Sequence, residues 1–156
     1  MKRNLWICLI LICGFVSVAT AQTDTPGLNG EPVKVNKETF QKYIYNYEKN
    51  PDSWIYEGEL PCIIDFYVDW YGPCRQQTHV LKEIAKKYKG KVIVYKVDVE
   101  AQRELANYLG IQNLPTIVFV PVGATPQAAE GFLPFNDLEA LLGDVFQIEV
   151  IETTEI

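Results

Sequence analysis

The sequence predicts an α/β fold in which a central mixed β-sheet is flanked by helices. Its 156 residues suit a single domain. A composition of 48% apolar and 22% charged residues is sufficient to bury a core. Short β-branched runs alternate with segments of helical periodicity, in the order helix, strand, helix, strand, helix, strand, strand, helix. That order is typical of a layered α/β structure with a mixed sheet.

Residues 1–21 have the pattern of a secretory signal peptide. Two basic residues precede an apolar run over residues 5–18, and Ala19-Thr20-Ala21 has the small-x-small form of a cleavage site. The apolar run is short for the roughly 20 residues that a membrane span needs, so cleavage before Gln22 is favoured over an uncleaved anchor. We therefore expect an exported protein, either periplasmic or secreted.

Residues 22–34 are polar and contain Pro and Gly, and we interpret them as a linker. Asn36 can cap a first helix, whose apolar residues recur at i, i+3, i+4 and i+7 until Asn50-Pro51-Asp52 stops it. The apolar run Cys62–Tyr67 is bounded by Pro61 and predicts a buried strand.

The middle of the chain repeats this order. Gly72-Pro73 breaks the chain, and Pro73 suits the first position of a second helix, which ends at Gly90. The β-branched residues 92–97 predict the next strand. Asp98 can cap a third helix that Gly110 closes.

The last part of the domain predicts a strand over residues 116–120, an edge strand over residues 127–130 and a helix marked by apolar residues within 138–146. The acidic end of the chain has no clear period. We divide the chain into a signal peptide at residues 1–21, a linker at 22–34, a domain at 35–146 and a tail at 147–156.

Net charge and cysteine usage narrow the functional classes. The formal charge of −6 argues against a nucleic-acid partner or an anionic membrane, because both select a basic patch.

Signal cleavage would remove Cys8 and Cys13 and leave Cys62 and Cys74, for which one structural disulfide is the default in an oxidising compartment. However, the strand from Cys62 to Tyr67 alone spans roughly 16 Å, whereas bridged Cα atoms lie within about 7 Å. We therefore expect two unbridged cysteines.

The segment Asp65–Cys74 resembles the active-site stretch of thioredoxins. The family pattern is Trp-Cys-Gly-Pro-Cys, and this sequence reads Trp70-Tyr71-Gly72-Pro73-Cys74. Further matches follow in the family order and spacing, namely Lys96-Val97-Asp98, Leu114-Pro115-Thr116 and Gly131. The resemblance covers roughly residues 58–145. It implies the thioredoxin fold and descent from thiol–disulfide oxidoreductases.

Tyr71 changes the activity that this resemblance implies. In thioredoxins the first cysteine attacks a substrate disulfide as a thiolate, and the second resolves the mixed disulfide. A phenol has an ordinary pKa of about 10 and no sulfur, so Tyr71 can do neither. We therefore expect no normal dithiol turnover. Two alternatives stay open: Cys74 acts alone, helped by the start of its helix, or Tyr71 is a variant or sequence error one base away from cysteine. A small buried thiol is the favoured interpretation of Cys74.

The resemblance also assigns a buried proton-transfer pair and a docking rim. Asp65 and Lys96 would lie beneath Cys74, and a carboxylate in an apolar strand must be paired or have a raised pKa. A retained acid with a purely structural role is the alternative. Pro115 matches the family's cis-proline, which faces the active site. The rim, a shallow apolar site for an extended peptide, would consist of Trp70, Gly72, Pro73, Leu114, Pro115 and Gly131. Simple packing is the alternative role for Trp70.

No metal or cofactor is expected. His79 is the only histidine, and five helical residues at about 100° each turn it roughly 500° from Cys74, so the two do not form a Cys–His pair. No metal-ligand spacing is present. We expect a monomer whose partner is an extended polypeptide or a thiol-containing client protein. The identity of the client and of a membrane redox partner stays open.

Overall fold

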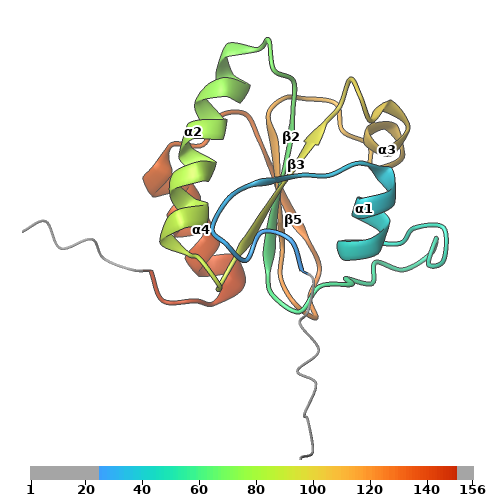
Figure 1. Ribbon diagram of the computed structural model, residues 1–156, viewed down its shortest axis with the longest axis horizontal. Coiled ribbons are helices and arrows are strands. Elements are labelled where there is room, and N and C mark those ends of the chain that lie inside the picture. Colours follow the sequence, from blue (N-terminus) through green and yellow to red (C-terminus); the bar gives the residue numbers. More distant parts are fainter. Residues whose placement is uncertain (1–24, 151–156) are drawn as a thin grey trace, which may run out of the picture.

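A computed structural model describes residues 25–150, which form a five-stranded sheet with helices on both faces (Figure 1). The strand order is β1-β3-β2-β4-β5. β1 and β2 run parallel to β3, whereas β4 is antiparallel to both β2 and β5. The expected mixed sheet is confirmed. In chain order the elements are β1 (Val33–Lys34), α1 (Lys37–Tyr43), β2 (Cys62–Tyr67), α2 (Gly72–Lys87), β3 (Ile93–Asp98), α3 (Arg103–Tyr108), β4 (Thr116–Val120), β5 (Gln127–Glu130) and α4 (Phe135–Phe146).

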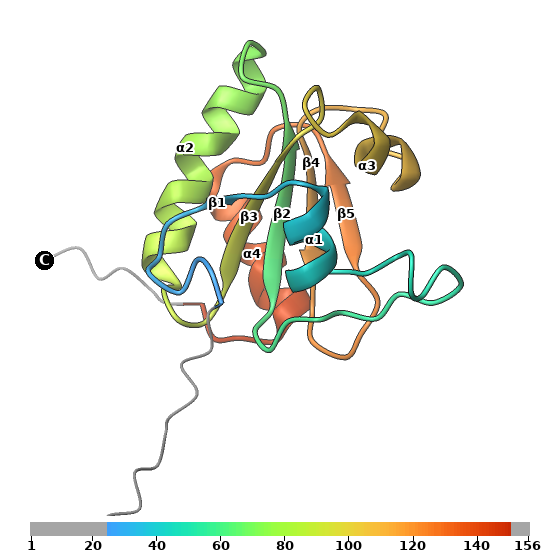
Figure 2. The same cartoon turned by 45° about the vertical axis from the view of Figure 1, so that its right-hand side comes forward.

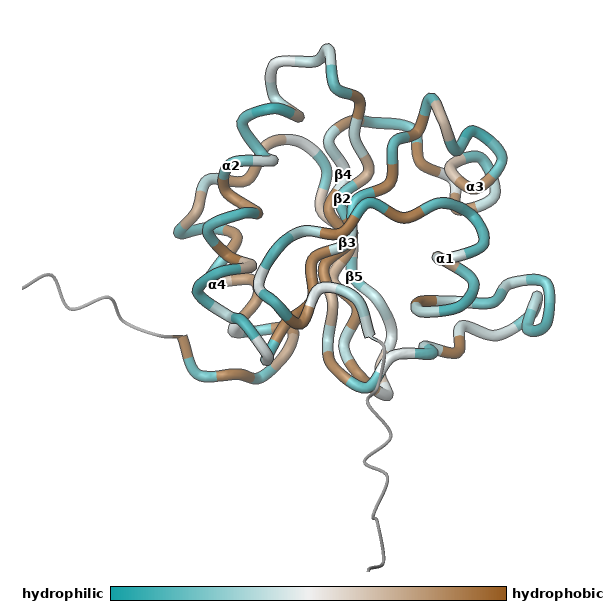
Figure 3. Tube along the Cα trace, viewed as in Figure 1, coloured by the Kyte–Doolittle hydropathy of each residue, from teal (hydrophilic) through white to brown (hydrophobic). Residues whose placement is uncertain are grey.

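The central strand β2 separates two apolar layers. α1 and α3 cover one face of the sheet, and α2 and α4 cover the other (Figures 1 and 2). Side chains alternate along a strand, so Cys62, Ile64 and Phe66 join the α1 and α3 layer, while Ile63 joins the α2 and α4 layer. Figure 3 shows the hydrophobic residues concentrated along the strands and the inner sides of the helices.

The first helix is shorter than the sequence predicts. Asn36 caps it as expected, because its side chain accepts from the N–H of Thr39 at 2.9 Å. The helix ends at Tyr43, and the later residues of the apolar pattern lie in a loop. In this loop Tyr45 forms an isolated β-bridge with Tyr56, and the centroids of the Tyr45 and Trp54 rings lie 4.3 Å apart. Ile44 and Tyr47, the later residues of the apolar pattern, are buried outside the helix, and Tyr47 stacks on Tyr108 with 4.2 Å between ring centroids.

Contacts of the described domain extend past the inner ends of the predicted linker and tail. Val33–Lys34 lies inside the predicted linker, yet it pairs with Tyr95 and Lys96 of β3 as the edge strand β1. At the other end, Ile148 packs against the core shared by α2 and α4. Chain pairing and apolar packing therefore extend the domain beyond residues 35–146. The predicted signal peptide and residues 151–156 lie outside the described residues.

Asp98 does not cap the third helix. α3 begins at Arg103 after Gln102, and Asp98 instead accepts the N–H groups of Glu100 and Ala101, which fixes the turn after β3. No helix within residues 25–150 is both long and apolar enough to cross a membrane.

Candidate functional site

The candidate site lies where β2 ends and α2 begins. Pro73 occupies the first turn of α2, where its missing N–H costs no helical hydrogen bond. Tyr71 is the residue before the helix and is 40% exposed, whereas Cys74 is fully buried. The Cys74 side chain packs against Tyr67 and Val68, with the partly buried Leu114 alongside. Helix geometry thus turns residue 71 outward and residue 74 inward.

The Cys74 thiol is held in its protonated form. Burial raises its pKa above the ordinary value, and the nearby Asp65 carboxylate raises it further. A backbone hydrogen bond at Val68 and the charge of Lys96 oppose these effects without reversing them. A thiolate is the nucleophile in exchange, so this environment favours the buried-thiol interpretation over an activated one.

The other cysteine of residues 25–150, Cys62, is also free and buried. Its side chain belongs to the apolar layer of α1 and α3, on the opposite face of β2 from Asp65. Burial raises its pKa to about 12. The structure therefore does not bring Cys62 to the candidate site.

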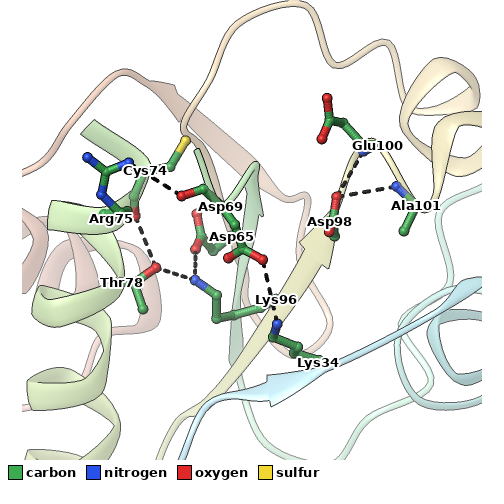
Figure 4. Close-up of polar contacts among 10 residues, drawn as sticks. All are labelled: Lys34, Asp65, Asp69, Cys74, Arg75, Thr78, Lys96, Asp98, Glu100 and Ala101. Carbon is green, nitrogen blue, oxygen red and sulfur yellow. Dashed lines mark hydrogen bonds and ion pairs between the residues drawn. The ribbon is translucent and has the colours of Figure 1, made fainter. Parts of the chain in front are cut away.

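A polar network lies beneath Cys74. Asp65 and Lys96 are both buried, and Lys96 Nζ donates to Asp65 Oδ2 at 2.8 Å (Figure 4). Lys96 also donates to the Thr78 hydroxyl, which itself donates to the Cys74 carbonyl at 3.0 Å. Burial raises the pKa of Asp65, although Lys96 partly offsets this. The expected pair is thus assembled, and it is tied to α2 through Thr78.

Thr78 was missed by the sequence analysis. A threonine four residues after another helical residue can donate to that residue's carbonyl, so the sequence contained a signal for its bond to Cys74. Nothing local in the sequence indicated its second hydrogen bond, which Lys96 of β3 donates to it.

Two further loops bring the remaining rim residues to the same end of the sheet. The Leu114–Pro115 peptide bond is cis, as expected. The Gly131 N–H donates to the Pro115 carbonyl at 2.8 Å, which joins the residue 131 loop to the start of β4. Pro115 itself is buried, whereas Leu114 and Gly131 are partly exposed.

Phe132 is a second residue that the sequence analysis missed. It follows Gly131 and is 39% exposed. The next residue, Leu133, donates its N–H to the buried Gln77 side chain of α2 at 2.8 Å, which ties this loop to the helix that bears Cys74. Phe132 therefore adds an exposed aromatic ring close to Gly131.

Trp70 has a defined orientation despite being 67% exposed. Its indole Nε1–H donates to Glu100 Oε1 at 3.2 Å, and its ring centroid lies 6.0 Å from that of Tyr71, edge to face. Trp70 is therefore an exposed ring whose orientation is set by contacts with Glu100 and Tyr71.

The residues that the structure describes contain no cluster of three or more His, Cys, Asp or Glu side chains suited to a metal. His79 is exposed on α2, on a different side from the buried Cys74.

The thioredoxin family model matches residues 31–144 of this sequence. The chain belongs to the thioredoxin family. Thioredoxins are disulfide oxidoreductases that act on thiol-containing client proteins. The matched range includes every residue that we assigned to the candidate site.

Individual thioredoxins support the same assignment. The thioredoxin of Borreliella burgdorferi is 35% identical over 114 residues, covering 73% of this chain and 97% of that protein. The thioredoxin of Alicyclobacillus acidocaldarius is 36% identical over 91 residues, covering 58% and 87% respectively. Among solved structures, chloroplastic thioredoxin z matches with a TM-score of 0.62 and 31% identity, over 73% of this chain and 93% of that one.

Proposed function

We propose that this thioredoxin-family protein docks extended polypeptide at its active-site end without dithiol turnover. The observation that carries the proposal is the pairing of an exposed Tyr71 with a fully buried Cys74 at the start of α2. Tyr71 stands where the family pattern has the attacking cysteine, and its phenol cannot form a disulfide. Cys62 lies on the other face of the sheet, so residues 25–150 contain no second thiol that could replace it.

Docking needs only the rim, which three separate segments supply. Trp70 precedes α2, Leu114 and Pro115 precede β4, and Gly131 follows β5. The exposed Trp70 ring beside the partly exposed Leu114 and Gly131 suits an extended peptide, for which main-chain bonds supply affinity and side-chain contacts supply selectivity. Phe132 enlarges the apolar surface next to Gly131.

We also propose that the protein is exported and that its mature chain begins at Gln22. The basic start, the apolar run and the Ala-x-Ala sequence support this proposal. Export would place the rim among the unfolded or partly folded chains of an extracytoplasmic compartment.

A reductase assay and a binding assay together test the proposal. With insulin as the disulfide substrate and dithiothreitol as the reductant, the native protein should give no rate above the dithiothreitol blank. By calorimetry it should bind a carboxamidomethylated, unfolded polypeptide, and Trp70→Ala should weaken that binding. A Cys74-dependent rate, or the absence of binding, would contradict the proposal.

The second candidate function is a one-cysteine oxidoreductase that uses Cys74. Its support is the position of the thiol at the start of α2, although burial raises the pKa of Cys74 and a backbone hydrogen bond at Val68 offsets only part of that rise. Thiol titration separates the two functions. We expect Cys74 and Cys62 to be unreactive toward iodoacetamide in the folded protein. After denaturation both should react without prior reduction, because neither is in a disulfide. Rapid labelling of Cys74 in the folded protein would instead favour the enzyme.

A further inference from the structure

Two aromatic rings and a carboxylate meet at the solvent-exposed edge of the docking rim. Trp70 and Tyr71 are both exposed, with an angle of 64° between their ring planes. Glu100 accepts the indole N–H through Oε1 and is itself exposed. The faces of Trp and Tyr rings attract cations because the π-systems are electron-rich.

Glu100 is held in place by the turn that follows β3. Asp98 Oδ1 accepts the N–H of Glu100 at 3.0 Å and that of Ala101 at 3.3 Å (Figure 4). The chain of contacts therefore runs from Asp98 to Glu100 and on to Trp70. Asp98 fixes the backbone at Glu100, and the indole hydrogen bond orients its carboxylate, so both side chains lose less entropy when a ligand binds than two free side chains would.

Among the described residues, no Lys, Arg or His side chain lies within ion-pair distance of the Glu100 carboxylate. Arg75 Nη1 donates to the Trp70 carbonyl at 2.6 Å, and Lys34 pairs with Asp69 at 4.0 Å, so these two cations are directed elsewhere. The chain as a whole carries a formal charge of −6.

We propose that Trp70, Tyr71 and Glu100 form a subsite for a basic side chain of the docked polypeptide, an arginine or a lysine. This proposal rests on the proposed docking function and specifies its ligand. An arginine guanidinium can stack on an aromatic face while its N–H groups donate to a carboxylate. Both contacts are weak at an exposed site, and together they favour the basic peptide by roughly fivefold.

Two blocked pentapeptides test the subsite by calorimetry with the native protein. Both have the order Ala-Leu-X-Leu-Ala, with X either arginine or citrulline, which has nearly the same shape and no charge. We expect the arginine peptide to bind about fivefold more tightly, and we expect most of that preference to disappear in molar salt. Glu100→Gln, which keeps an acceptor for the Trp70 indole, should reduce the preference to about twofold, the share that the aromatic rings supply.

Glu83→Gln is the matched control, since it removes the same charge from the exposed face of α2 and should leave the preference intact. A preference that stays at its native size in Glu100→Gln would overturn the subsite. If both peptides bind equally and both weaken in Trp70→Leu, polypeptide docking stands and the basic subsite is wrong. If neither peptide binds the native protein, both the docking function and the subsite are wrong.

Discussion

At the scale of single residues, the geometry of the first turn of α2 exposes Tyr71 and buries Cys74. The residue before the first turn of α2 faces solvent, while the residue three positions later faces the core. A thiol at residue 71 would be accessible and close to the N–H groups at the start of a helix, which stabilise a thiolate. A thiol at residue 74 is instead buried beside the Asp65 carboxylate, and its pKa rises.

We predict that Tyr71→Cys gains disulfide reductase activity. The substitution restores an accessible sulfur, while Gly72, Pro73 and Cys74 already form the rest of the motif. Insulin reduction should then exceed the dithiothreitol blank, and turnover should be lost when Cys74→Ser is added, apart from trapped mixed disulfides. Tyr71→Ser is the matched control and should stay inactive. A Tyr71→Cys protein that folds, as judged by circular dichroism, yet stays inert would show that the surrounding site no longer supports exchange.

Asp65 should make the stability of the protein fall as pH rises. Burial raises its pKa in the native state above the ordinary value of about 3.9. The native state therefore binds the Asp65 proton more tightly than the unfolded chain does, so its contribution to stability is present at low pH and is lost as pH rises through the raised pKa.

Urea unfolding from about pH 4 to about pH 8 measures this effect. The free energy of unfolding of the native protein, minus that of Asp65→Asn, should decrease with pH, because the asparagine carries no titrating proton. Subtraction removes the contributions of other groups that titrate over the same range. An increase of this difference with pH would mean that Lys96 outweighs burial and lowers the pKa of Asp65.

At the scale of elements, α1 depends on its cap because it is only seven residues long. Asn36 and Thr39 satisfy each other's backbone N–H groups in a capping box. We predict that Asn36→Ala lowers the free energy of unfolding by about 1 kcal/mol in urea. Asn107→Ala, the same change on the exposed side of α3, should have no destabilising effect, since alanine favours helix. Equal losses in both variants would argue against the cap.

Elements whose boundaries follow from local sequence were predicted well. β2 and β4 are bounded by proline and consist of apolar runs, and the predicted ranges agree with the observed ones. β1 was missed because it has only two residues, and its partner in β3 is about sixty residues away along the chain. The end of α1 was misplaced because burial of Tyr45 against Trp54 depends on tertiary contacts that helical periodicity does not encode.

The same distinction explains which parts of the site could be anticipated. The motif around Cys74, its acid Asp65 and the cis-proline lie in recognisable local patterns, so the resemblance located them. Glu100 and Phe132 do not lie in any such local pattern. Glu100 acquires its role from a hydrogen bond to a residue thirty positions earlier, and Phe132 from a loop that Gln77 holds against α2. Single-sequence patterns contain no signal for either contact.

At the scale of the whole molecule, the described residues begin at residue 25, after the predicted cleavage site. The first hydrogen bond among them closes the turn in which the Gly30 N–H donates to the Gly27 carbonyl, just before β1. Removal of residues 1–21 would therefore leave every described residue in place.

We predict that intact-mass spectrometry of the natively expressed protein gives the mass of a chain starting at Gln22. Replacing both Ala19 and Ala21 with leucine should block cleavage, because the peptidase site accepts only small side chains, and the N-terminal residues should then be retained. The same double change should leave the urea midpoint of a chain refolded from denaturant unchanged, since neither alanine belongs to the described domain. A native mass that includes Met1 would contradict cleavage before Gln22 and would favour the uncleaved anchor instead.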